Sequence, residues 1–400
     1  MRTLPVYACI ALACQALAPA VGAASPEPIA AAVADGETRF TLRYRHEHVD
    51  QAGFDRHANA STVRARLTWL SAAAGAWQAG IEADYLWAGT ERYDSTVNGR
   101  TRYPVVADPE DFDLNQAYVT HTTQTATLTG GRQRIRHADE RFVGGVGWRQ
   151  NEQTFDAVRV LFEPQEALAI DYTYLANVNR VFGPEDGTQP ADWRSDSHLL
   201  MANARPRPGL TLSAFGYLLD FDNDNGPLNS NATFGVEGRF TAGPTAFSAS
   251  FARQTDHAAN PLDYVAYYLH LEAEVTLTPA TVKLGWERLG SDDGEAAFRT
   301  PLATLHLFQG WADQFLTTPD VGVRDAYLAA QAVHGPVRLT AVRHWFEADH
   351  GGADLGRELD LSLGWTVSGR LGVELKYADY RADGFASDTR KAWLTVNLSL

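Results

Sequence analysis

The sequence predicts an all-β fold: a single transmembrane antiparallel β-barrel of about 18 strands, with short periplasmic turns and long extracellular loops. Three observations predict it. Apolar and polar residues alternate along segments of about ten residues, short and long connections alternate between these segments, and aromatic residues gather near the segment ends. A tilted strand needs roughly 9–11 residues to cross a bilayer, whereas soluble strands usually have about 5–6. The pattern therefore favours a barrel in an outer membrane over a soluble sandwich.

The N-terminus predicts a cleavable export signal. Arg2 gives a basic start, residues 6–17 form an apolar run too short for a membrane helix, and small residues lead up to Ala23. Both cysteines of the chain, Cys9 and Cys14, fall inside this segment. The mature chain therefore has neither disulfides nor thiolate chemistry.

The rest of the chain divides simply. We assign residues 1–23 to a signal peptide, with cleavage there or one residue later, residues 24–37 to a short periplasmic leader, and residues 38–400 to the barrel. The leader is too short to form a plug domain inside the barrel. This argues against an energy-coupled receptor, whose lumen such a domain fills.

Alternation places apolar side chains toward lipid and polar side chains toward a lumen. The clearest segments are 40–45, 63–69, 77–87, 265–275, 358–367 and 371–377. Aromatic residues near the strand ends, which predict interfacial girdles, are Trp69, Trp77, Trp87, Trp286, Trp365 and Tyr377. The last strand, 394–400, should close the barrel against the first and be read by the barrel assembly machinery.

Connection lengths give the strand count. The short turns lie near 73–75, 121–123, 164–166, 206–209, 242–244, 278–280, 334–336 and 368–369. The long connections cover roughly 50–62, 88–112, 136–154, 178–197, 222–231, 256–262, 290–322, 347–356 and 381–390. The strands between them number about eighteen, and the asymmetry of the two ends is typical of outer-membrane barrels.

Charges that line the lumen determine what a porin passes. Parity along the predicted strands places many basic residues on the inner face, and those of the first strands form a stripe along which a polyanion could slide. The alternative is a solvated lumen of paired charges without substrate preference. The candidate pore-lining residues are Arg43, Arg45, Arg64, Arg66, Arg159, Arg239, Lys283 and Arg338. Acidic residues face inward mainly in later strands.

Two blocks of sequence resemble the alginate-export outer-membrane porin family. The central motif is matched by GRQRIR (131–136), RFVGG (141–145), WRQ (148–150) and TFDAVR (154–159), and a late loop by FRTPLATLH (298–306) and GWADQFL (310–316). The resemblance implies an eighteen-stranded monomer for passive passage of an anionic polysaccharide, such as an alginate-like polyuronate, through an Arg-lined pore. It adds Arg132 and Arg134 to the pore-lining candidates and supports Arg159.

Arg132 needs a further assumption. With Leu128 facing lipid, simple parity sends Arg132 outward as well. A β-bulge at Gly130 and Gly131 would turn it back to the lumen, and we predict one there.

Two long connections should enter the barrel. The Gly-rich, basic loop 136–154 is expected to fold into or over the pore mouth, although an ordinary outer loop is the alternative. The loop 290–322 contains Leu305, Phe308 and Trp311, which are too apolar for a free surface loop. We expect it to pack inside the barrel or against other loops.

One acidic stretch is a weak calcium candidate. Asp220, Asp222 and Asp224 are spaced as in a Ca²⁺ loop, but Gly226 falls one place late for the EF-hand pattern and no Glu closes it. A solvated acidic loop is the alternative. We expect no other metal and no cofactor.

Three functions remain. The first is export or diffusion of an anionic polysaccharide, the second uptake of small anionic sugars or oligosaccharides, and the third an outer-membrane enzyme with a loop-borne site. No catalytic motif supports the third, so no enzymatic activity is expected; a Ser–His or carboxylate pair at the barrel rim would favour it. The net charge of -15 argues against nucleic acid as a partner. Expected partners are the polysaccharide, outer-membrane lipid and lipopolysaccharide, the barrel assembly machinery and a periplasmic polysaccharide-synthesis complex.

Overall fold

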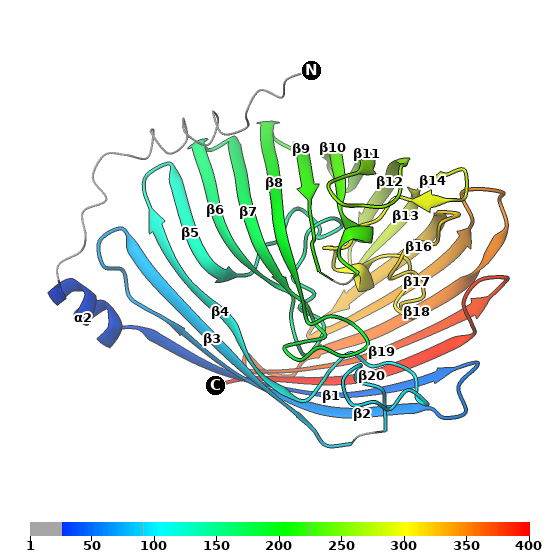
Figure 1. Ribbon diagram of the computed structural model, residues 1–400, viewed down its shortest axis with the longest axis horizontal. Helices are drawn as coiled ribbons and strands as arrows, with labels where there is room; N and C mark the ends of the chain where they lie inside the picture. The colour runs from blue at the N-terminus through cyan, green and yellow to red at the C-terminus, as the bar shows by residue number, and fades with distance from the viewer. Residues whose placement is uncertain (1–25, 91, 224) are drawn as a thin grey trace.

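Eighteen antiparallel strands close into one barrel in the computed structural model (Figure 1). The first strand, β1, pairs with β2 on one side and with the last strand, β20, on the other, so the sheet has no free edge. The structure describes residues 26–400 except 91 and 224, and the predicted signal peptide lies outside these residues. The predicted fold class is confirmed.

The strands are long enough to cross a bilayer. The barrel strands are β1 (Glu37–Gln51), β2 (Ala58–Leu70), β3 (Trp77–Ala88), β4 (Asp111–Thr122), β5 (Ala126–Gln133), β6 (Thr154–Gln165), β7 (Leu168–Asn179), β8 (Asp192–Arg207), β9 (Leu210–Leu219), β10 (Asn231–Ala242), β11 (Thr245–Asp256), β12 (Val265–Leu277), β13 (Ala280–Leu289), β16 (Val323–His334), β17 (Val337–Glu347), β18 (Asp354–Thr366), β19 (Leu371–Ala382) and β20 (Thr389–Ser399). The short elements are α2 (Pro26–Ala34), η1 (Pro227–Asn229), β14 (Ser291–Asp292), β15 (Ala296–Ala297) and η2 (Leu305–Leu307).

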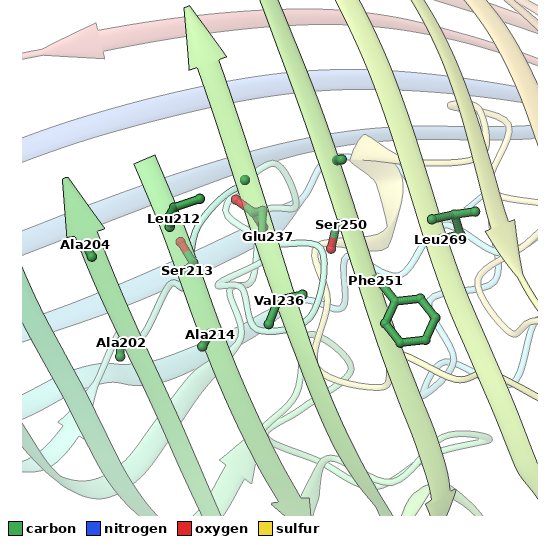
Figure 2. A pocket seen from close by; sticks show the side chains of 12 residues that line it. Ala202, Ala204, Leu212, Ser213, Ala214, Val236, Glu237, Ser250, Phe251 and Leu269 are labelled. Carbon is green, nitrogen blue, oxygen red and sulfur yellow. The ribbon is translucent and has the colours of Figure 1, made fainter. Parts of the chain in front are cut away.

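Side chains alternate between the two faces of the wall as predicted. Leu67, on the lipid-facing side of β2, is half exposed, whereas its neighbour Arg66 is buried in the lumen. Figure 2 shows part of the wall formed by β8 to β12, where Leu212, Val236 and Phe251 line a groove on the outer face. An apolar outer face is stable because lipid tails solvate it, while the lumen takes the polar residues.

Short turns and long loops occupy opposite ends of the barrel. The turns include the two-residue connections 208–209 and 335–336, and the long loops include 89–110, 134–153 and 290–322. The asymmetry is as predicted. The loop between β1 and β2 is shorter than expected because β1 runs to Gln51 and β2 already begins at Ala58.

The leader forms the short helix α2 before β1. The carbonyl oxygen of Ala32 accepts a 2.9 Å hydrogen bond from the amide of Ala72, in the turn between β2 and β3. The helix therefore contacts the turn side of the barrel. Within residues 26–400, apart from the two gaps, no helix is long and apolar enough to cross a bilayer.

The predicted bulge at Gly130 and Gly131 is wrong. Residues 126–133 of β5 pair without a register shift with β6, and residues 127–132 pair equally regularly with β4. Gly131 instead adopts a positive φ of 119° within the regular ladder, where a Cβ would lie 2.3 Å from the carbonyl oxygen of Ala117. The glycine allows β4 and β5 to approach closely here, and the alternation of inward and outward side chains along β5 is unchanged.

Candidate functional site

The loop between β5 and β6, residues 134–153, lies inside the barrel against β1 and β2. The guanidinium of Arg43 donates to the carbonyl oxygens of Gly147 (3.0 Å) and Arg149 (3.1 Å). Arg45 donates to the carbonyl oxygen of Trp148, and Arg64 to that of Gln150. The expectation that this loop enters the pore is confirmed, and the arginines of the first strands are what bind it.

Arg43, Arg45 and Arg64 lie close together on β1 and β2 and form a cationic surface that we call the arginine wall. Arg43 and Arg64 are direct cross-strand partners, and like charges directly opposite each other destabilise a sheet. The carbonyl oxygens of residues 147–150 supply acceptors for this pair. Carboxylates lie farther from two of the arginines: Asp108 is 3.9 Å from Arg45, and Glu152 is 3.6 Å from Arg64.

A second group of charges binds the C-terminal end of the same loop. Arg66 contacts Asp84 at 2.5 Å on the wall and Glu152 at 2.8 Å on the loop. Arg134, at the start of the loop, pairs with Glu82 and with Glu152. Burial alone would raise the pKa of Glu152, but Arg66, Arg134 and Arg64 hold it well below its usual range. Glu152 is thus an ionised anchor for the loop.

The loop between β13 and β16, residues 290–322, also lies inside the barrel, as predicted. Val143 of the first loop forms a parallel bridge with Leu302, and the amide of Gly144 donates to the carbonyl oxygen of Leu302 at 2.8 Å. Phe298 and Leu302 are fully buried within the apolar cluster that joins both loops to the wall. The two loops therefore form one packed body, which we call the plug.

Charged residues bind the plug to the last strands. His306 Nδ1 lies 2.7 Å from Asp313, and the other carboxylate oxygen of Asp313 accepts from Lys391 of β20 at 2.7 Å. The ring of Trp148 stacks on His306 with 3.5 Å between centroids, and Lys376 of β19 lies 2.7 Å from His306 Nε2. Burial and the charge of Lys376 lower the pKa of His306 to about 3, although Asp313 raises it. The imidazole is therefore neutral near pH 7.

Arg141 anchors the plug on the opposite wall. Its guanidinium contacts Glu287 of β13 at 2.5 Å and donates to Thr300 of the second loop at 3.0 Å. Glu287 also accepts from the Tyr268 hydroxyl at 2.7 Å. Arg141 is 2% exposed, and its buried charge is compensated by Glu287, while Thr300 and Gln309 accept further hydrogen bonds from it.

A cavity of about 440 Å³ lies between the plug and β10 to β13, β16 and β17. Phe308 and Trp311 of the plug present aromatic surface to it. Its basic side chains are those of Arg141, Arg239 and Lys283, and its carboxylates are those of Asp139, Glu237, Glu272, Glu287 and Asp325. The lumen thus has a basic side at β1 and β2 and a more acidic side here.

The remaining predicted basic residues are mostly paired within the lumen. Arg159 pairs with Asp171 through two guanidinium nitrogens, Arg239 contacts Glu274 at 3.3 Å, and Lys283 lies 3.1 Å from Glu272. Arg338 faces the lumen beside the turn between β16 and β17 and has no ion-pair partner among the described residues.

Arg132 is not a lumen residue. Because β5 is regular, Arg132 keeps the outward parity of Leu128 and lies opposite Ala117. It pairs with Asp156 of β6 at 2.8 Å, and its side chain is 27% exposed. The prediction that it lines the pore is wrong, because it depended on a bulge that does not exist.

The calcium candidate lies only partly within the residues that the structure describes. Asp224 lies outside the described residues, and the carboxylate of Asp222 pairs with Arg194 at 3.0 Å. Across residues 26–400, with their two gaps, no group of three His, Cys, Asp or Glu side chains could hold a metal ion.

Sequence parity missed the functional residues of the loops. These are Asp108, Arg141, Arg149, Glu152 and Asp313, each of which joins the plug to the wall or to another loop. Arg141, Arg149 and Asp313 stand inside the two sequence blocks that resemble the family, and this resemblance is the only sequence feature that could have indicated them. A loop has no alternation, so the pattern could not say where their side chains point.

Comparisons with known proteins agree with this architecture. Among solved structures, Pseudomonas aeruginosa OccK3 (OpdO) matches with a TM-score of 0.70 and 17% identity over 93% of this chain and 97% of that one. Acinetobacter baumannii OccAB4 matches with 0.71 and 13% over 91% and 98%, and P. aeruginosa OpdK with 0.71 and 15% over 92% and 99%. At these identities the likeness concerns the fold.

The family is shown by sequence. No curated protein matches the chain, but the family model described as "Alginate export" matches residues 37–255. The matched segment is more than half of the chain and contains the arginine wall and the first plug loop. The fold and the family together place the protein in a Gram-negative outer membrane as a multi-pass barrel. The protein belongs to the alginate-export family of outer-membrane porins.

Proposed function

We propose that this porin passes an anionic saccharide of the polyuronate type, whose carboxylates exchange with the plug on the arginine wall. The observation that carries the proposal is that Arg43, Arg45 and Arg64 donate to neutral carbonyl oxygens of residues 147–150. A charge-assisted hydrogen bond to a carboxylate is roughly twice as strong as one to a neutral acceptor. A uronate can therefore replace the loop on the same guanidinium groups.

The distribution of free and paired arginines also suits passive passage. Apart from Arg338, the other candidate arginines of the lumen are already bound to carboxylates of the wall, as in the pair of Arg159 with Asp171. Multiple weak sites, rather than a single tight one, suit passage through a pore. The passage is passive, and the family match supports an exported polymer as its cargo.

The test is single-channel conductance in planar bilayers with polymannuronate or with neutral dextran of equal length. We expect anion-selective channels that polymannuronate blocks and dextran does not. The double variant R43Q/R64Q should lose block, whereas R253Q, which changes an outward-facing arginine of β11, should behave as wild type. Channels that are cation-selective and that polymannuronate does not block would refute the proposal.

Uptake of small anionic solutes is the second candidate, and the cavity of about 440 Å³ beside the plug favours it because that volume suits a small ligand. One structural neighbour, OpdK of P. aeruginosa, was solved with vanillate, a small carboxylate. Block that is equally strong with monomeric uronate and with the polymer would favour this candidate. Block that grows with chain length would favour export.

The enzyme hypothesis receives little support. His46 Nδ1 and Ser61 Oγ lie 2.8 Å apart, but both residues are on the lipid-facing side of β1 and β2. No third side chain among the described residues orients the other nitrogen of His46. A porin is therefore the function that we propose.

A further inference from the structure

A groove of about 510 Å³ lies on the lipid-facing side of the barrel, near the loop ends of β16 to β19. Part of its floor is Ala326, whose direct neighbours across the sheet are Trp286 on β13 and Trp345 on β17. Tryptophan at a strand end marks the membrane interface. The groove therefore lies at the height of the outer-leaflet headgroups.

Two arginines meet at this groove. Arg357 of β18 lies directly opposite Trp345 on one side and directly opposite Arg381 of β19 on the other. Arg381 contacts Asp379 at 3.0 Å and Asp388 at 3.6 Å. Arg357 is exposed and has no hydrogen bond or ion pair with any residue that the structure describes. Two like charges in direct cross-strand positions destabilise the sheet unless an anion lies between them.

The barrel contains a second outward arginine pair that shows such an anion. Arg288 of β13 lies directly opposite Arg324 of β16, and Asp349 contacts the first at 2.7 Å and the second at 3.3 Å. A carboxylate of the chain thus bridges that pair. No described carboxylate bridges Arg357 and Arg381.

The acids that line the groove do not fill this role. Glu347 lies 3.6 Å from Arg324, and Asp354 accepts a 2.8 Å hydrogen bond from the amide of Gly356. Asp383 also lines the groove, and neither Arg357 nor Arg381 has an ion pair with it. The arginine pair is the part of the groove whose charge remains without a shared counterion.

We propose that this groove binds the phosphorylated headgroup of lipid A, with one phosphate between Arg357 and Arg381. Arginine forks match phosphate geometry, and the apolar surface of Ala326 and Trp345 below them suits the lipid part of the same molecule. A groove that opens toward the membrane suits a ligand that is itself part of the membrane better than a soluble anion. The site is on the outer wall and is independent of what the lumen transports.

The test is native mass spectrometry of the purified barrel in detergent, titrated with diphosphoryl lipid A. The main variant is R357Q, because Arg357 has no hydrogen bond or ion pair with a described residue, and R381Q is the second. R253Q is the matched control, since Arg253 also faces outward and lies between Phe234 and Tyr267 on another wall. We expect R357Q to weaken lipid A binding about tenfold, as for loss of one charge-assisted contact of about 1.4 kcal/mol, and R253Q to leave it unchanged.

Two further probes identify the source of the phosphate. Dephosphorylated lipid A should bind as weakly to wild type as diphosphoryl lipid A binds to R357Q. Inorganic phosphate at the same concentration should not displace lipid A. Equal binding by R357Q and wild type, equal binding of the dephosphorylated lipid, or displacement by inorganic phosphate would each overturn the proposal.

Discussion

Replacing Glu152 with glutamine should release the plug from the arginine wall. Glu152 is 5% exposed and contacts Arg66 at 2.8 Å and Arg64 at 3.6 Å, with Arg134 as its third partner. Removing one partner of a buried ion pair costs about 3–5 kcal/mol, and the amide retains some hydrogen bonding, so we take about 3 kcal/mol. That free energy corresponds to a population of the detached loop raised on the order of a hundredfold.

The assay is the open probability of single channels in planar bilayers. E152Q should open far more often than wild type and should prefer anions more strongly, because three guanidinium groups lose a counter-charge. The control is E274Q, since Glu274 pairs with Arg239 and Lys283 on the wall and touches no plug residue in the described contacts. Open probability in E152Q equal to that of wild type and E274Q would refute the role given to Glu152.

Three more predictions concern the plug and the wall. Lowering the pH from about 6.5 toward 4 should raise the open probability. The imidazole of His306 takes up a proton when the plug is detached, but its pKa of about 3 keeps it neutral when the plug is bound, so the bound state is fully favoured only above pH 6.5. The variant H306Q should remove the pH effect. R141A should lower the free energy of unfolding by about 3–5 kcal/mol, because Glu287 loses its buried partner, and an unchanged melting temperature in detergent would contradict this. R132Q should leave the reversal potential in a salt gradient unchanged while R43Q shifts it toward cations, and equal shifts would contradict the assigned orientations.

The alternation of apolar and polar residues correctly predicted which side chains of the barrel strands face the lumen in β1 and β2. The alternation predicts Arg43 and Arg64 in the lumen because each lies between apolar residues of a long alternating strand, and a closed sheet converts that alternation into two faces. The prediction that Arg132 lines the pore is wrong because it departs from this alternation. The predicted bulge reconciles the strand with the family motif, but two glycines in a row fit a regular ladder equally well.

The partners of these arginines could not be predicted. Arg43 needs the carbonyl oxygens of residues about a hundred positions later, and Arg141 needs Glu287 from a strand farther still. Loops have no periodicity that fixes side-chain direction, so their residues are placed only by the lumen that encloses them. The apolar content of residues 290–322 predicted that this loop is enclosed, but not which strands it contacts.

The plug also bridges the place where the first and last strands of the barrel meet. Arg149 contacts Glu47 of β1 at 3.2 Å and Asp313 at 3.7 Å, and Asp313 contacts Lys391 of β20 at 2.7 Å. The ladder between β1 and β20 is the seam at which the sheet closes on itself. A chain of ion pairs therefore crosses that seam from the inside, and loosening the plug to let cargo through also removes support from the joint that holds the cylinder shut.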